Sequence, residues 1–131
     1  MAEVATELGV AKPTLYRLAG SKDQLVRACV DLEAERLLGH LHAVDMEATS
    51  ALATMSATLD AMRRFAQDSP GGFRLLFERR GPEAQQAVAR VEAGLAALLR
   101  RNGQPAERLE IVAAGLLGAA SAVVSRTQAT R

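Results

Sequence analysis

Residues 2–25 constrain the fold most strongly, because they predict two short helices joined by a tight turn and followed by a third helix. Ala5 and Leu8 are the apolar positions of the first helix, and Leu15 and Leu18 point back toward it from the second. Gly9 stands at the corner, where glycine adopts a left-handed backbone without a side-chain penalty. This spacing predicts a helix-turn-helix, a motif whose second helix can lie in the major groove of DNA.

The outward face of the second helix carries four side chains that suit nucleic acid: Lys12, Thr14, Tyr16 and Arg17. Cations suit phosphates and guanine edges, a threonine can meet a base edge or a thymine methyl, and a phenol can donate to a phosphate. No acidic residue occurs between Lys12 and Lys22. Spacing alone leaves two interpretations open, a DNA-reading helix and an ordinary solvated helix with a charged face.

Resemblance favours the first interpretation. Leu8-Gly9-Val10, the run from Lys12 to Arg17, Gly20-Ser21-Lys22 and Leu25 closely resemble the DNA-binding segment of the TetR family of transcriptional repressors. The resemblance implies a homodimeric, all-helical regulator that binds palindromic, double-stranded operator DNA. It also implies that the larger C-terminal part dimerises and binds a small-molecule effector, which releases the DNA. Carried over by position, the family's DNA contacts fall on six residues: Lys12, Pro13, Thr14, Tyr16, Arg17 and Lys22.

The segment departs from the family pattern in three ways. Leu18 and Ala19 stand where the family usually has a histidine and an aromatic residue, which removes one polar contact and one packing ring. Ala11 replaces the usual Ser or Thr and is a poor helix N-cap. Family members also place a complete helix before the segment that opens here at Met1. We expect the chain to lack the first and the last helices of the family.

Composition predicts that the whole chain is helical. Hydrophobic residues make up 49% of the 131 residues, but aromatic residues only 3%, with no Trp, so Ala, Leu and Val must build the core. That mixture favours helices over strands. We expect an all-α protein, with a truncated helix-turn-helix DNA-binding segment and its connecting helix at residues 1–44. A helical regulatory and dimerisation bundle is expected at residues 45–131.

Charge and cysteine content limit the partners and the compartment. The formal net charge is only +1, so a polyanionic partner must be met by a local patch, such as Lys12, Arg17 and Lys22. Cys29 is the single cysteine, which excludes an internal disulfide, suits a reducing compartment and favours a buried structural thiol. The sequence shows no signal peptide and no run near the roughly 18 apolar residues of a membrane span. We therefore expect a cytoplasmic protein without a membrane partner.

A long helix connects the DNA-reading segment to the rest of the chain. Ser21 and Gln24 occupy the capping-box positions at its start. Its apolar positions form two stripes, one of Leu25, Cys29 and Leu32, and one of Val26, Val30, Leu37, Leu41 and Val44.

Four further helices follow from periodicity and from Gly and Pro positions. The first covers residues 45–68, with apolar residues at near-heptad spacing: Leu52, Met55, Leu59, Met62 and Ala66. Ser69-Pro70 starts a short helix that Gly81-Pro82 stops, and a third helix runs from Pro82 to about Arg101. The last helix follows Pro105, with small residues between apolar ones, and we expect a subunit contact there through Leu116, Ala120 and Val123.

The effector pocket is predicted at Met62, Phe65, Phe73 and Phe77. Two of the three phenylalanines share one face of the short helix, although plain core packing explains the same spacing. His40 and His42 lie about 200° apart around a helix, which argues against a shared metal. We find no phosphate-binding Gly loop, no Cys/His metal spacing and no catalytic His arrangement, and so expect no enzyme activity, cofactor or metal. The alternative function is a small-molecule-binding or protein-interaction bundle that no longer binds DNA.

Overall fold

The computed structural model describes residues 21–44, 51–79, 81–103 and 107–129. This part of the chain contains helices and turns and no strand, which confirms the all-α prediction. Six elements follow one another along the chain: α3 (Lys22–Ala43), α4 (Ala51–Asp68), α5 (Pro70–Phe73), the π-helix η1 (Arg74–Glu78), α6 (Pro82–Arg101) and α7 (Leu109–Ala129). Most of the predicted helix-turn-helix lies outside the described residues.

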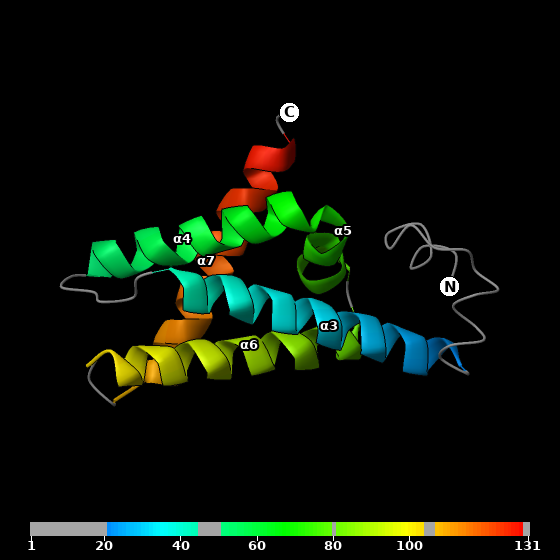
Figure 1. Ribbon diagram of the computed structural model, residues 1–131, viewed down its shortest axis with the longest axis horizontal. Coiled ribbons are helices and arrows are strands. Elements are labelled where there is room, and N and C mark those ends of the chain that lie inside the picture. The colour runs from blue at the N-terminus through cyan, green and yellow to red at the C-terminus, as the bar shows by residue number, and fades with distance from the viewer. Residues whose placement is uncertain (1–20, 45–50, 80, 104–106, 130–131) are drawn as a thin grey trace.

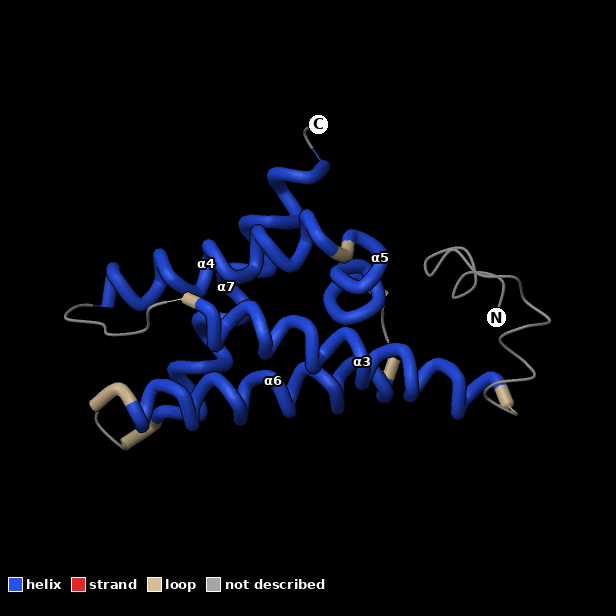
Figure 2. Tube along the Cα trace, viewed as in Figure 1, coloured by secondary structure: helices blue, strands red, loops and turns tan. Residues whose placement is uncertain are grey.

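The long helices form one bundle around a shared hydrophobic core. Helix α3 packs against α6 on one side and against α4 on the other, and α7 packs against both α4 and α6. Figure 1 shows α3 and α6 lying side by side, while α7 crosses behind them at a steep angle. The short elements α5 and η1 close the bundle between α4 and α6, and the described loops are brief turns (Figure 2).

Helix α3 starts as the sequence predicts. The Ser21 hydroxyl accepts a hydrogen bond from the Gln24 backbone N–H at 3.2 Å, and this cap satisfies a donor that the helix cannot use itself. The stripe of Val26, Val30, Leu37 and Leu41 is buried as predicted.

The other predicted stripe of α3 is wrong at Leu32, which is 50% exposed. The buried stripe passes from Cys29 to Glu33 and on to Leu37, so a carboxylate occupies the core position. A polar residue can replace an apolar one there because its oxygens find hydrogen-bond donors inside the bundle.

The predicted stripe of α4 is also wrong at its first member, since Leu52 is 77% exposed. Thr54 and Thr58 face the core instead, and the Thr58 hydroxyl donates to the Thr54 carbonyl at 2.9 Å. A threonine bonded to its own helix in this way can be buried without an unmet polar group. Met62 and Phe65 are fully buried on the same face, as expected for core positions.

The segment after α4 contains a turn that the sequence did not predict. Pro70 begins α5 at its first position, as expected, but the Ser69 hydroxyl does not cap that helix and bonds to Glu33 instead. The chain then widens into η1, whose π-type turn closes with the Arg79 N–H donating to the Arg74 carbonyl at 2.8 Å. Such π-turns are short and are found often at functional sites.

Helix α6 has the predicted bounds, from Pro82 to Arg101. It ends at Asn102, and Gly103 adopts a positive φ of 85°, a conformation that favours glycine. Arg100 and Arg101 lie in its last turn, where positive charge is favourable.

Helix α7 has two different apolar faces. One face is buried against α4 and α6 and consists of Leu109, Ala113, Leu117, Ala120 and Val124. Ala120 is fully buried within its own chain, so its predicted place in a subunit contact is wrong, whereas Val123 is 39% exposed. Ile111 and Val112 are 70% and 46% exposed on the outer face.

The apolar character of α7 also corrects the expectation for membrane spans. Within the described residues, Leu109–Gln128 is long and apolar enough to cross a membrane by length and composition alone. The core helices of soluble proteins pass the same test, and α7 has a core-facing side, so this one helix is weak evidence for a membrane partner.

Close packing at Gly72 generates a stability prediction. A Cβ atom there would overlap the Glu33 carboxylate and lie 2.6 Å from the Ser69 hydroxyl oxygen. Gly72→Ala must displace Glu33 from its partners, so we expect the free energy of unfolding to fall by about 1–3 kcal/mol. Gly39→Ala is the matched control, because nothing lies within 4 Å of its Cβ position.

The control substitution in α3 should raise the free energy of unfolding by about 0.5–1 kcal/mol, since alanine is the better helix former. Urea unfolding followed by circular dichroism measures both variants. Equal effects of the two substitutions would show that the contact between Gly72 and Glu33 does not limit the packing.

Candidate functional site

Lys22 is the only predicted DNA contact within the described residues. It is the first residue of α3, and its side chain is exposed. A cation at the start of a helix suits a phosphate, because the helix dipole and the backbone N–H groups that Ser21 does not cap favour an anion there. Five other predicted contacts lie outside the described residues: Lys12, Pro13, Thr14, Tyr16 and Arg17. All six assignments stay predictions.

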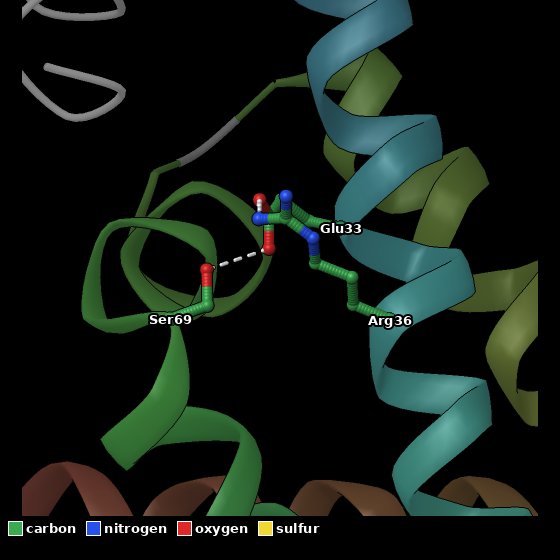
Figure 3. Close-up of polar contacts among 3 residues, drawn as sticks. All are labelled: Glu33, Arg36 and Ser69. Carbon is green, nitrogen blue, oxygen red and sulfur yellow. Dashed lines mark hydrogen bonds and ion pairs between the residues drawn. The ribbon is translucent and has the colours of Figure 1, made fainter.

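A buried polar cluster joins the middle of α3 to the start of α5. The Glu33 side chain is fully buried, and one carboxylate oxygen accepts a 2.7 Å hydrogen bond from Arg36. The other oxygen accepts a 2.8 Å hydrogen bond from the Ser69 hydroxyl, as Figure 3 shows. Burying a carboxylate is costly unless such donors surround it. The cluster therefore fixes α3 against the junction of α4 and α5.

Cys29 lies one turn before Glu33 and is buried as a free thiol. Burial raises the pKa of the Cys29 thiol, the Glu33 carboxylate raises that pKa further, and the positive charge of Arg79 opposes both. The thiol therefore stays protonated at neutral pH and is a poor nucleophile. This environment agrees with the structural role that the sequence favoured.

The predicted effector residues do not share one cavity. Met62, Phe65 and Phe73 are fully buried in the core, and Phe77 is half-buried. The rings of Phe73 and Phe77 lie 5.3 Å apart. Phe65 lines one cavity and Phe77 lines another, so the assignment of these four residues to an effector stays a prediction.

The first cavity lies between the C-terminal half of α3 and the end of α4. It has a volume of 590 Å³ and is lined by Arg36, His40, Phe65 and Asp68, among others. The Asp68 carboxylate lies 3.2 Å from the His40 ring nitrogen, so the polar groups of its wall pair with each other. His42, the second histidine, is exposed on α3.

The second cavity lies between η1, α6 and α7, and we call it the α6–α7 cavity. Its volume is 400 Å³, and its wall includes Leu76, Phe77, Val88 and Leu117, with Arg79 beside them. An apolar wall with few polar groups is typical of small-molecule sites. Sequence analysis missed Arg79, although a cation directly after an aromatic helix face and before Gly81-Pro82 was a usable signal.

Glu33 was also missed from sequence. Leu25, Cys29, Glu33, Leu37 and Leu41 follow one another at intervals of four, so the acid occupies an otherwise apolar row. That interruption was the available signal for a buried carboxylate. Within the described residues, no group of three or more His, Cys, Asp or Glu side chains could hold a metal ion.

Comparison with known proteins matches both ends of the chain. Residues 1–29 match the family model described as bacterial regulatory proteins, tetR family. Residues 55–127 match the model described as the tetracyclin repressor-like C-terminal domain, which covers more than half of the chain. The chain belongs to the TetR family. It is accordingly a TetR-family transcriptional regulator, and the members of that family are DNA-binding regulators and not enzymes.

One curated relative is the HTH-type transcriptional activator FasR of Mycolicibacterium smegmatis. The two sequences are 27% identical over 125 residues, which cover 89% of this chain and 57% of the relative. The chain thus spans a little more than half the length of this relative. The TetR-family match to residues 1–29 ends inside α3, which continues from there into the helical bundle.

The burial of Cys29 predicts slow alkylation. At pH 8 we expect iodoacetamide to modify Cys29 on the order of tenfold more slowly than an exposed thiol, because the group is buried and protonated. The matched control is Cys29→Ala combined with Ser56→Cys, since Ser56 is exposed on α4. Equal rates, measured by mass spectrometry, would show that the native thiol is open to solvent.

The same pKa shift sets a pH dependence of stability. The fold favours the neutral thiol, so this contribution is complete below the ordinary cysteine pKa of about 8.5 and falls as the pH rises above it. The free energy of unfolding of the native protein should therefore fall relative to that of Cys29→Ala between pH 7 and about pH 10, as urea unfolding can measure. A constant difference between the two proteins over that range would contradict the assignment.

Proposed function

We propose that the protein is a ligand-responsive regulator that binds palindromic operator DNA as a homodimer in the cytoplasm. One observation carries the proposal: α3 begins beside the predicted DNA-reading segment and runs into the core, where Glu33 holds it to the α4–α5 junction. We keep the division into a DNA-binding part at residues 1–44 and a regulatory part at residues 45–131. Helix α3 then lies within the DNA-binding part of the sequence, but it packs against the helices of the regulatory part.

The proposed mechanism is a population shift. An effector that prefers a bundle conformation in which the two recognition helices are wrongly spaced weakens DNA binding. By linkage, operator DNA weakens binding of that effector by the same factor. Helix α3 is the element through which the bundle acts on the DNA-reading segment, because it contacts α4, α5, η1 and α6.

The outer face of α7 supports the homodimer. Its exposed positions are apolar or small over most of the helix: Ile111, Val112, Gly115, Ala119, Ala122 and Val123. An exposed apolar face of this length is typical of an interface, and small residues let two helices approach closely. A second copy of the chain can present the same face about a two-fold axis.

The direction of regulation has two candidates. We propose repression, because a dimer seated on an operator excludes other proteins from that DNA without further contacts. Activation is the second candidate, favoured by the name of the relative FasR. Transcription in vitro from a template with the operator separates them, since added protein lowers the transcript in the first case and raises it in the second.

The homodimer proposal predicts that Ala119→Arg separates the subunits. A guanidinium at the centre of the outer face of α7 would lose its hydration on association, so we expect the mass in solution to halve. Ala89→Arg on the exposed side of α6 is the matched control and should leave the mass unchanged. Sedimentation equilibrium gives both masses, and a dimeric Ala119→Arg variant would place the interface elsewhere.

The DNA-binding proposal predicts different effects for two residues. Lys22→Ala removes a phosphate contact in each subunit, so affinity should fall alike for all sequences, and the log-log salt slope should flatten by about 0.9 per lost contact. Thr14→Ala should cost on the order of 1–3 kcal/mol against the preferred base at one position of each half-site, with the salt slope unchanged.

Fluorescence anisotropy with operator duplexes at several salt concentrations measures both variants. Arg64→Ala, in the exposed part of α4, is the control and should change neither quantity. A uniform loss of affinity in both variants would exclude Thr14 from base recognition. A protein that binds small molecules but shows no salt-dependent DNA affinity would favour the bundle that no longer binds DNA.

A further inference from the structure

The α6–α7 cavity combines an apolar wall with one cation, Arg79, among the described residues that line it. Leu76, Phe77, Val88 and Leu117 line one part of its 400 Å³, and Arg79 lines another. The Nη1 atom of Arg79 is buried and makes no hydrogen bond to any described residue. A guanidinium cannot lose its charge in a protein, so its buried N–H groups favour a hydrogen-bond acceptor.

The nearby carboxylates do not serve Arg79. Both oxygens of Glu33 are bonded, one to Arg36 and one to Ser69. The Glu78 carboxylate lies 3.4 Å from the Ser125 hydroxyl, which donates to it. Glu92 lines the cavity itself but forms no ion pair with Arg79 in the described part of the chain. A bound carboxylate would supply an acceptor that the carboxylates of the described residues do not.

The backbone of η1 places Arg79 at this position. The π-type turn ends with the Arg79 N–H bonded to the Arg74 carbonyl, and Arg79 itself has extended dihedral angles, φ −86° and ψ 124°. The chain therefore leaves the helix at Arg79, two residues after the half-buried Phe77. An aromatic surface and a fixed cation are thus brought to the same cavity by residues two apart.

We propose that the α6–α7 cavity binds a small organic anion, a carboxylate with an apolar body, whose charge is held by Arg79. A planar guanidinium suits a carboxylate because it can donate two parallel hydrogen bonds to it. The apolar body lies against Phe77, Val88 and Leu117, and the Ser121 hydroxyl on the same wall can act as donor or acceptor. This assignment names the class of the effector and so rests on the proposed ligand-responsive function.

Occupancy of this cavity reaches the proposed dimer interface directly. Leu117, Gly118 and Ser121 of α7 line the cavity, and Ala119 lies on the outer face of the same turn. A bound anion therefore contacts the helix that we propose to join the subunits. Displacement of α7 would alter the relative position of the two subunits without any contact between the effector and DNA.

Isothermal titration calorimetry with a matched pair of probes tests the proposal. The probes are 2-naphthoate and its neutral analogue 2-naphthamide, which have the same apolar body. We expect the native protein to bind the acid roughly tenfold or more tightly than the amide. Arg79→Met should remove that preference, while Arg64→Met, on the exposed side of α4, should retain it.

A second variant keeps the test decisive if Arg79→Met fails to fold. Glu92→Gln removes the acid that lines the cavity and leaves Arg79 in place, so it should tighten binding of naphthoate and leave naphthamide unchanged. Equal affinity of the two probes for the native protein, or no binding of either, overturns the proposal, as does a preference that persists in a folded Arg79→Met. Operator binding measured without a probe tests the proposed function separately.

Discussion

The buried carboxylate of Glu33 is the interaction on which the rest of the structure depends. An acid inside an aliphatic bundle is stable only with its donors in place, so Arg36 and Ser69 must be positioned together with it. That requirement fixes how closely the α4–α5 junction approaches α3. It also explains why residue 72, which lies against the Glu33 carboxylate, is a glycine. A set of aliphatic helices that could otherwise slide along one another is thereby held in one register.

Periodicity predicted the helices best where Gly and Pro punctuate the chain. The bounds of α6 follow from Pro82 and Asn102-Gly103, and its buried residues follow from a plain 3.6-residue repeat. The predicted apolar stripes were wrong at Leu32 and Leu52, which are exposed because neighbouring polar residues occupy the core face of their helices. Thr54 and Thr58 can do so because a helix carbonyl accepts the Thr58 hydroxyl, and no hydrophobic pattern contains that information.

The predicted effector pocket also shows that side-chain packing decides features that the sequence pattern does not contain. Aromatic residues at helical spacing suggested one pocket, yet Met62 and Phe73 fill the core while Phe65 and Phe77 face different cavities. Phe77 itself lies in the π-type turn of η1, whose repeat is wider than the α-helical spacing on which the prediction of one pocket rested. Small residues on both sides of α7, such as Ala113 and Ala119, let neighbours approach it from two directions.

The part of α3 that precedes Glu33 can act as a lever arm, because it joins the buried carboxylate to the predicted DNA-reading segment. Lys22 lies eleven residues before Glu33, so about 16 Å of helix separates the two positions at 1.5 Å per residue. A tilt of about 10° around Glu33 would carry the start of α3 through about 3 Å, close to the roughly 3.4 Å spacing of neighbouring bases along a DNA strand. The same tilt would move the buried side chains of Leu25 and Val26 by about 2 Å, so the core packing near the start of α3 and the position of the DNA-reading end must change together.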